Sequence, residues 1–290
     1  ELCGNAYAKI NLGLNVLPVR PDGFHNIESI FQTVSLADKV FVSLEQGKGV
    51  CNVSCSSKGY TLELPLKNTI SNSYKAFQSI TSMELPSVNV VLEKHIPSGG
   101  GLGGGSSDAA TFVKLLEKIT SVVLTTEQRF KIASTVGSDV FFFMSCPASG
   151  SYAALVSGRG EIVQTITPRQ DFSILLVFPG VYSSTKEAYS LVDSCLVPDF
   201  GVSLEHLVDV YNSPVSSWAF TNSFTNPLQD RYPKIKESLQ GIKNTGALFT
   251  QMSGSGSTCF GIYDSFKLCK NAESVLQLKG YSCIALQGLF

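Results

Sequence analysis

A glycine-rich segment from Pro97 to Ser107 constrains this 290-residue chain more than any other feature of its sequence. Of the seven positions from Gly99 to Gly105, six are glycine and one is Leu102. Because glycine lacks the Cβ atom that keeps a backbone away from a ligand, successive N–H groups in such a loop can converge on phosphate oxygens. A helix is predicted directly afterwards, from about Ser106 to Ile119, and the free N–H groups of a helix start favour an anion. We therefore expect a phosphate-binding loop rather than a flexible linker.

The loop differs from two well-known kinds of nucleotide loop. A Walker A loop ends in Gly-Lys-Ser or Gly-Lys-Thr, and this segment does not. The dinucleotide fingerprint G-x-G-x-x-G is formally present at Gly99, Gly101 and Gly104, with Glu127 downstream, but any glycine-saturated stretch produces that match. A nicotinamide-dependent oxidoreductase therefore stays an alternative at this point, as does a nucleotide-binding protein without catalytic activity.

Composition is that of an ordinary globular protein, with 43% hydrophobic residues, 16% charged residues and a formal net charge of -1. A nucleic-acid-binding protein would usually carry a basic surplus, and no apolar run is long enough to cross a bilayer. We therefore expect neither nucleic acid nor a membrane as a partner. The eight cysteines are scattered without a CxxC pair, which predicts reduced thiols, a cytoplasmic location and no metal centre of the protein's own.

Period-two alternation predicts the first strand. From Ala6 to Val16 the apolar side chains fall on one face, and Lys9 and Asn11 fall on the other. The run from Arg20 to Gly23 predicts a turn after it.

Two strands, Val40–Leu44 and Val50–Cys55, are predicted to form a hairpin across Gln46–Gly49. Further strands are expected at 88–92, 174–178, 247–252, 258–263 and 281–286, and helices after Asn68 and at 186–191, 203–211, 234–239 and 266–276. Strands and helices mix without a regular βαβ rhythm, which predicts the α+β class. The turn from Ser157 to Gly160 predicts a boundary between an N-terminal domain, residues 1–160, and a C-terminal domain, residues 161–290.

Three segments resemble the motifs of the GHMP kinase superfamily, and they occur in the order of that family. Pro97–Ala110 is similar to the central ATP motif, Ala6–Leu12 to the first motif and Met252–Ser257 to the third. The doubled glycines with two serines, and the Pro-Asp-Gly-Phe-His run that ends at His25, resemble one branch in particular. That branch phosphorylates the 2-hydroxyl of a cytidine-diphosphate-linked methylerythritol in non-mevalonate (MEP) isoprenoid-precursor biosynthesis. A sibling kinase acting on mevalonate or homoserine stays an alternative.

The resemblance implies a two-domain GHMP kinase fold. A ribosomal-S5-like N-terminal domain, which binds ATP, would pack on a ferredoxin-like C-terminal domain, with the active site between them. The cofactors implied are ATP and Mg²⁺, since a metal normally bridges the β- and γ-phosphates. The partner implied is the small-molecule substrate, and the protein is expected to be a monomer or homodimer.

The resemblance also implies a catalytic pair, Lys9 and Asp139. We expect Asp139, which also contacts substrate, to accept the proton of the substrate hydroxyl while Lys9 holds the aspartate and a phosphate oxygen. The family usually has alanine and proline where this chain has Ser138 and Phe141, and these departures leave the carboxylate in place. Without the resemblance, a cap of a helix or turn would explain Asp139 as well.

The remaining site residues also follow from the resemblance. Phe24 and His25 are expected at the cytosine ring, with phenylalanine where tyrosine is usual, and Asn11 at polar groups of the substrate. The residues expected at the nucleotide are Asn68, Lys94, Pro97, Ser98, Gly99, Gly100, Gly101, Leu102, Gly103, Gly104, Gly105, Ser106 and Ser107. A plain helix N-cap explains Asn68 equally well, and a solvated strand position explains Asn11 or Lys94.

Overall fold

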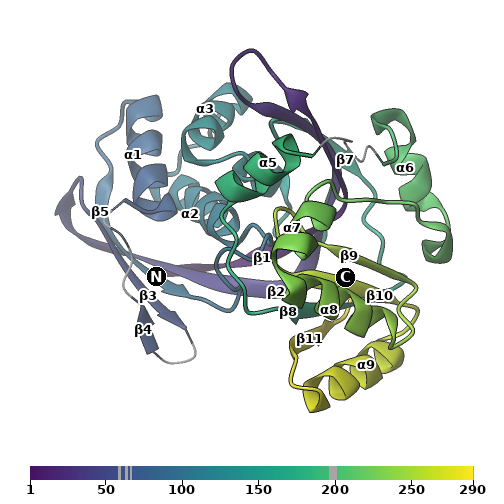
Figure 1. Cartoon of the computed structure of the whole chain (residues 1–290). Coiled ribbons are helices and arrows are strands. Elements are labelled where there is room, and N and C mark those ends of the chain that lie inside the picture. The colour runs from purple at the N-terminus through teal and green to yellow at the C-terminus, as the bar shows by residue number, and fades with distance from the viewer. Residues whose placement is uncertain (58–59, 63–64, 66, 196–200, 290) are drawn as a thin grey trace. The chain divides into compact units, whose positions relative to one another are not determined.

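The structure, a computed structural model, describes residues 1–57, 60–62, 65, 67–195 and 201–289. The chain forms two compact units, whose elements are labelled in Figure 1. The first unit comprises Glu1–Ala8, Leu36–Ser98 and Gly103–Cys146, and the second comprises Lys9–Ser35, Gly99–Leu102 and the described residues from Pro147 onward. The boundary between the units falls within strands β1 (Leu2–Val19) and β2 (His25–Lys48), so each of these strands contributes residues to both units. The chain also passes from one unit to the other at both ends of Gly99–Leu102. The consecutive boundary expected near residue 160 stays a prediction.

The sheet of the first unit corrects one prediction. Strand β5 (Pro86–Glu93) lies between the C-terminal part of β2, to which it is antiparallel, and β3 (Cys51–Ser57), to which it is parallel. A short strand, β4 (Tyr60–Leu62), pairs with β3. The strands themselves were predicted, but the hairpin across Gln46–Gly49 is wrong, because β5 is inserted between its two arms. The central position suits β5 because its alternate apolar side chains, Val88, Val90 and Leu92, are all buried, whereas in β3 only Cys55 is.

The described residues of the first unit also form four helices: α1 (Thr69–Thr81), α2 (Gly104–Thr120), α3 (Thr126–Val136) and α4 (Val140–Ser145). Helix α1 packs against α2 and α3, and α4 packs against α2 and α3. Asn68 caps α1 through a capping box with Ser71, as its position predicts. Helix α2 buries Phe112, Val113 and Leu116, and this apolar face fixes the helix that follows the glycine loop.

The described strands of the second unit belong to two sheets. In one, residues Ile27–Gln32 of β2 pair antiparallel with β6 (Ala153–Gly158), which pairs with β7 (Ile162–Ile166). In the other, β8 (Ser173–Phe178), β9 (Phe249–Met252), β10 (Cys259–Tyr263) and β11 (Ser282–Leu286) are antiparallel in the order β11-β8-β10-β9. Helices α8 (Pro233–Lys243) and α9 (Phe266–Leu278) pack on this second sheet. This order is that of a ferredoxin-like unit, which confirms the fold expected for the C-terminal part.

The connection between β8 and β9 carries α5 (Thr185–Asp193), α6 (Leu204–Asn212), the short 3₁₀ turn η1 (Val215–Ser217) and α7 (Thr225–Arg231). The predicted strands and helices between residues 174 and 286 are all present. No pattern in the sequence had indicated β4, β6, β7, α3, α4, η1 or α7. Among the described residues, no helix is long and apolar enough to cross a membrane.

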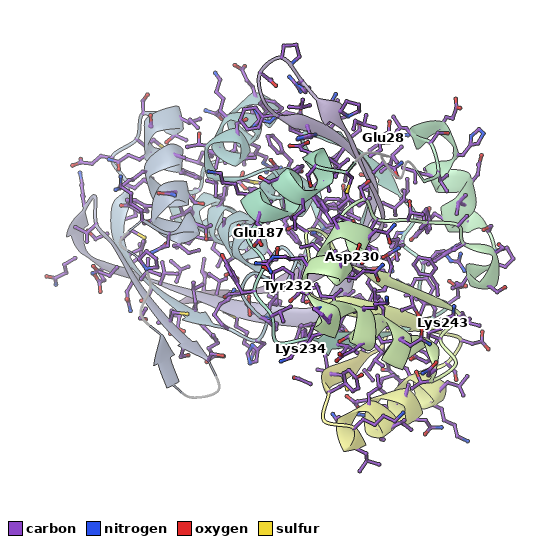
Figure 2. The ribbon with its side chains drawn as sticks, in the orientation of Figure 1. Glu28, Glu187, Asp230, Tyr232, Lys234 and Lys243 are labelled. Carbon is purple, nitrogen blue, oxygen red and sulfur yellow. The ribbon has the colours of Figure 1, made fainter. Side chains whose placement is uncertain are left out.

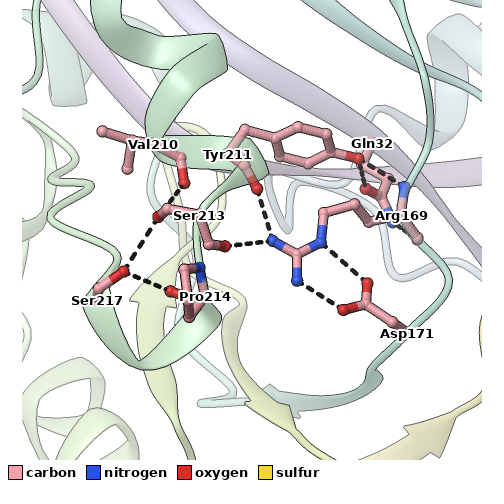
Figure 3. A network of polar contacts seen from close by, with 8 residues as sticks. All are labelled: Gln32, Arg169, Asp171, Val210, Tyr211, Ser213, Pro214 and Ser217. Carbon is pink, nitrogen blue, oxygen red and sulfur yellow. Dashed lines mark hydrogen bonds and ion pairs between the residues drawn. The ribbon is translucent and has the colours of Figure 1, made fainter.

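A partly buried polar network joins α6 to the segment that leads into β8 (Figure 3). The guanidinium of Arg169 donates two hydrogen bonds to Asp171, at 2.6 and 2.9 Å, and one each to the carbonyls of Tyr211 and Ser213, both at 2.6 Å. The hydroxyl of Tyr211 accepts from the backbone N–H of Arg169 at 2.7 Å and donates to Gln32 at 2.5 Å. Because its donors are committed within the protein, we assign Arg169 a structural role.

Candidate active site

The glycine loop adopts a backbone that explains its composition. Gly99, Gly101 and Gly103 have φ angles of 70°, 76° and 71°, in the left-handed region that residues with a Cβ rarely adopt. At Gly101 space is lacking as well, since a Cβ atom would lie 2.1 Å from the carbonyl oxygen of Ser253. Glycine is therefore required there for two independent reasons.

The start of α2 has the properties of an anion site. Gly103 occupies the N-cap position without a side chain to cap the helix, and the first turn contains no acidic residue. The first backbone N–H groups are thus left for a ligand, and the helix dipole favours a negative one. Ser106 and Ser107 add hydroxyl groups in this first turn. The helix begins at Gly104, two residues before the predicted start.

In the second unit, the first and third motifs meet the glycine loop at one carbonyl oxygen, that of Gly101. The ammonium of Lys9 donates to it at 3.1 Å, and the hydroxyl of Ser253 donates to it at 3.0 Å. Lys9 also donates to Asn11 Oδ1 at 2.6 Å, and the lysine is only 3% exposed. A backbone hydrogen bond from Lys9 N to Leu102 O, at 3.0 Å, reinforces the contact between strand and loop. The three motifs therefore form one connected group.

Asn11 is part of the same group and is not a solvated strand residue, because only 1% of it is exposed. Its side-chain amide donates to the hydroxyl of Ser29 at 3.1 Å, and its backbone N–H donates to Ser253 Oγ at 3.3 Å. Ser29 in turn donates to the carbonyl of Gly13. These contacts set the direction of the Asn11 carbonyl oxygen toward Lys9. Contact of Asn11 with substrate stays a prediction.

Lys94, in the first unit, is the centre of a buried charge cluster. Its ammonium contacts Asp38 and, at 2.6 Å, Asp108 of α2. The other oxygen of Asp38 accepts from the backbone N–H of Ile96 at 2.8 Å. Burial disfavours the charged ammonium, but the two carboxylates outweigh it and raise the pKa of Lys94. The alternative of a solvated position is wrong for Lys94, and its contact with a nucleotide stays a prediction.

Asp108 is the less well paired carboxylate of this cluster. Burial raises the pKa of Asp108 to about 7, with the attraction of Lys94 opposing and the repulsion of Asp38 adding to the effect. One of its oxygens, Oδ1, is buried and lacks a hydrogen-bond partner among the described residues. The cluster holds two carboxylates and one ammonium, so it carries a surplus negative charge unless one carboxylate binds a proton. Neither carboxylate was assigned a role from the sequence: Asp38 lies in no pattern that indicates a site, and Asp108, although it lies within the central motif Pro97–Ala110, follows the residues that were expected at the nucleotide.

Asp139 lies at the N-cap position of α4 and is half-buried, but its side chain makes no capping hydrogen bond. Asp139 therefore holds the cap position of α4 without capping the helix through its side chain, and its catalytic role stays a prediction. The far end of α4 is held by Lys114 of α2, whose ammonium donates to the carbonyls of Phe143 and Cys146 at 2.8 and 2.6 Å. Burial lowers the pKa of this lysine. The helix that follows the phosphate loop thus supports the helix that begins after Asp139.

His25 lies in an aromatic stack of the second unit. Its Nδ1 is 2.7 Å from the carbonyl oxygen of Leu17, and its Nε2 is 3.2 Å from a carboxylate oxygen of Asp193. Its ring stacks on Tyr189, with centroids 5.0 Å apart and 24° between the planes. Tyr189 and Phe224 form an edge-to-face pair, with centroids 5.0 Å apart and 90° between the ring planes. Tyr189 lies outside the three motifs, and sequence analysis missed it.

Phe24 is placed differently from His25. It is 49% exposed, and the guanidinium of Arg159 lies over its ring, 3.6 Å from the centroid. One face of Phe24 is therefore occupied by a cation.

Helix α5 carries Tyr189 and, at its last residue, Asp193, which contacts His25. The first turn of α5 is held by Tyr232, whose hydroxyl donates to both carboxylate oxygens of Glu187 at 2.9 and 3.0 Å. Glu187 and Tyr232 are labelled in Figure 2.

Comparison with known proteins agrees with these features. The family described as "GHMP kinases N terminal domain" matches residues 68–146, and that described as "GHMP kinases C terminal" matches residues 215–281. A protein of Treponema pallidum (strain Nichols), named 4-diphosphocytidyl-2-C-methyl-D-erythritol kinase, is 35% identical over 97% of each chain. A Thermotoga maritima protein of the same name is 36% identical over 89% of this chain and 90% of its own. A crystal structure of 4-(cytidine 5'-diphospho)-2C-methyl-D-erythritol kinase has a TM-score of 0.75 at 28% identity, over 99% of this chain and 100% of that one.

The fold and the phosphate loop therefore define an ATP-dependent kinase with the GHMP architecture. Within this superfamily, the chain belongs to the 4-diphosphocytidyl-2-C-methyl-D-erythritol kinase family. The α+β class and the two-domain GHMP fold expected from the motifs are confirmed, and the nicotinamide-dependent alternative is set aside.

Proposed function

We propose that this chain transfers the γ-phosphoryl group of ATP to the 2-hydroxyl of 4-diphosphocytidyl-2-C-methyl-D-erythritol. The hydroxyl oxygen forms a bond to the γ-phosphorus, the bond from that phosphorus to the bridging oxygen breaks, and ADP and the 2-phosphate leave. The observation that carries the proposal is the Gly101 carbonyl, which accepts hydrogen bonds from both Lys9 and Ser253. All three motifs of the kinase family are thereby connected in a single polar group.

The proposed roles follow from the chemistry of phosphoryl transfer, which depends on positioning and on positive charge near the transferring group. Asp139 accepts the proton of the attacking hydroxyl, and this general-base step contributes roughly 10²–10⁴-fold to the rate. The ammonium group of Lys9 stabilises the negative charge of the transferring phosphoryl group. The glycine loop and the start of α2 bind the phosphates through backbone N–H groups.

Magnesium belongs to the proposal as the ion that would offset the negative charge of the ATP phosphates. Among the residues that the structure describes, no group of three or more His, Cys, Asp or Glu is arranged to hold a metal ion. The hydroxyls of Ser106 and Ser107, in the first turn of α2, are the groups of this chain that would hold such an ion together with the phosphates. Such an ion, when bound, neutralises charge on the transferring phosphoryl group.

The substrate base is assigned to the aromatic stack of the second unit. Tyr189 and His25 offer parallel rings, and the partners of His25 hold its ring in one orientation. The two rings stack on each other, so a flat heterocycle such as cytosine would stack on a face of the pair that the pair itself does not cover. We place Tyr189 beside the base together with His25, while Phe24, covered on one face by Arg159, closes the edge of the site.

A coupled assay of ADP release tests the proposal. Purified protein with ATP and Mg²⁺ receives 4-diphosphocytidyl-2-C-methyl-D-erythritol, mevalonate or homoserine in separate reactions. ADP release is expected with the first substrate and at least about 100-fold less with the others, because each lacks the cytidine group. Folded protein that releases no ADP with the first substrate, or releases it faster with either other substrate, contradicts the proposal. A cytoplasmic location and a monomeric or homodimeric state also belong to the proposal, and light scattering tests the latter.

A further inference from the structure

Asn222 belongs to none of the three motifs, yet it is buried beside the third one, with 3% of its surface exposed. Its amide nitrogen donates to two carbonyl oxygens, that of Met252 at 2.8 Å and that of Gly254 at 2.9 Å. Its side-chain oxygen accepts from the backbone N–H of Phe224 at 2.9 Å. Both amide hydrogens and the amide oxygen are thus used, and a side chain without an NH₂ group cannot reproduce this pattern.

The residues on either side of Asn222 attach the same segment to β1, the strand that carries the proposed catalytic lysine. Leu14 N donates to the carbonyl of Thr221, and Ser223 N donates to the carbonyl of Leu14, both at 2.9 Å. The hydroxyl of Ser223 also accepts from Val16 N at 3.0 Å. The segment therefore pairs with β1 through a parallel bridge between Leu14 and Asn222, and the Asn222 side chain reaches the end of β9 and the loop after it.

We infer that Asn222 is a positioning residue for phosphoryl transfer. It holds the start of the Ser253–Ser257 loop against β1, so that the hydroxyl of Ser253 reaches the Gly101 carbonyl on which the Lys9 ammonium is anchored. A shift of this loop displaces the shared carbonyl, and with it the lysine. The inference rests on the proposed function for the choice of substrate in its test.

Two isosteric substitutions, Asn222→Asp and Asn226→Asp, form the test pair. The first places a carboxylate oxygen against the Met252 and Gly254 carbonyls in place of a donor. The second makes the same chemical change on exposed α7, where Asn226 accepts from Gln229 at 3.0 Å, a role that aspartate keeps. In the ADP-release assay we expect kcat of N222D to fall about 10- to 100-fold, with both KM values within about threefold of wild type, because a misplacement near 1 Å costs up to about 10²-fold. N226D is expected to match wild type.

Combination with Ser253→Ala separates positioning from a merely structural role. If Asn222 acts through Ser253, the double variant has nearly the kcat of the more impaired single variant. The reason is that the free-energy effects of two substitutions within one network do not add. If Asn222 only supports the fold, the melting temperature falls, kcat per folded molecule stays near wild type, and any effects of the two substitutions multiply. That second pattern overturns the inference.

A second variant covers the case in which N222D does not fold. Asn222→Ala removes the two donors without adding a charge, and it is read by the same kcat, KM and double-variant measurements. Failure of both variants to fold, judged by circular dichroism, overturns the positioning role and makes Asn222 a purely structural residue. An inactive wild type contradicts the proposed function instead, so the two failures are distinguishable.

Discussion

The ammonium of Lys9 is anchored on the carbonyl oxygen of Gly101, 3.1 Å away and 92 positions later in the chain. A second hydrogen bond, to Asn11 Oδ1 at 2.6 Å, leaves the lysine little freedom to rotate. A long side chain that is free loses up to about 2 kcal/mol of rotamer entropy when it is fixed, and here that cost is met in folding rather than at the time of reaction.

Replacement of Lys9 by methionine keeps the volume of the side chain and removes its charge. We expect kcat for ADP release to fall about 10²–10³-fold, as for the loss of one charge-stabilising donor in an active site.

Asp139→Asn is expected to lower kcat about 10²–10⁴-fold, because an amide cannot accept the hydroxyl proton. Lys39→Met, at an exposed position of β2, serves as the control. Near-normal turnover in folded K9M and D139N would contradict both roles.

Gly101→Ala is expected to destabilise the protein by about 2–4 kcal/mol and to lower kcat at least tenfold. The new methyl group would stand 2.1 Å from a backbone carbonyl in addition to occupying a left-handed conformation. Gly280→Ala is the matched control, because φ is 86° there and nothing lies within 4 Å of the added Cβ. It isolates the conformational cost, about 1 kcal/mol. Urea unfolding measures both, and equal losses in the two variants would exclude the steric contribution at Gly101.

The parts of the fold that sequence predicted are those set by local chemistry. The glycine loop and the alternating strand around Lys9 are recognisable because a short stretch of residues determines each. The hairpin prediction failed because strand pairing is not local. The turn at Gln46–Gly49 is compatible with a hairpin, but the continuous apolar face of β5 gains more burial between β2 and β3 than at an edge.

The missed site residues share the same explanation. Asp38 meets Lys94 from 56 positions away, and Asn222 meets the Gly254 carbonyl from 32 positions away. Neither pair leaves a spacing signal in a single sequence, because an aspartate or asparagine near a turn is more often a cap or a solvated residue. Tyr189 is hidden for another reason: an aromatic residue on an amphipathic helix has the pattern of ordinary core packing.

Removal of the aromatic ring at position 189 is expected to affect one substrate selectively. Tyr189→Ala should raise KM for the cytidine-linked substrate about tenfold, in line with the roughly 0.5–1.5 kcal/mol of an aromatic pair, and leave KM for ATP near wild type. Tyr189→Phe keeps the ring and is expected to behave like wild type. Steady-state kinetics with each substrate varied in turn tests this. An equal rise of both KM values, or equal damage in Y189F, would place the ring outside the base site.

The charge cluster predicts a pH dependence of stability that one substitution removes. Burial raises the pKa of Asp108 from 3.8 to about 7, so between these values the folded protein binds a proton that the unfolded chain releases. The stabilisation from this group is complete below about pH 4 and is lost as pH rises through about 7, by at most about 4 kcal/mol. Urea unfolding of wild type from pH 4 to 8 should show this loss, and Asp108→Asn should lack it, whereas Asp264→Asn on the surface should follow wild type. Parallel profiles for wild type and D108N would mean that Asp108 is ionised throughout, with Lys94 alone compensating its charge.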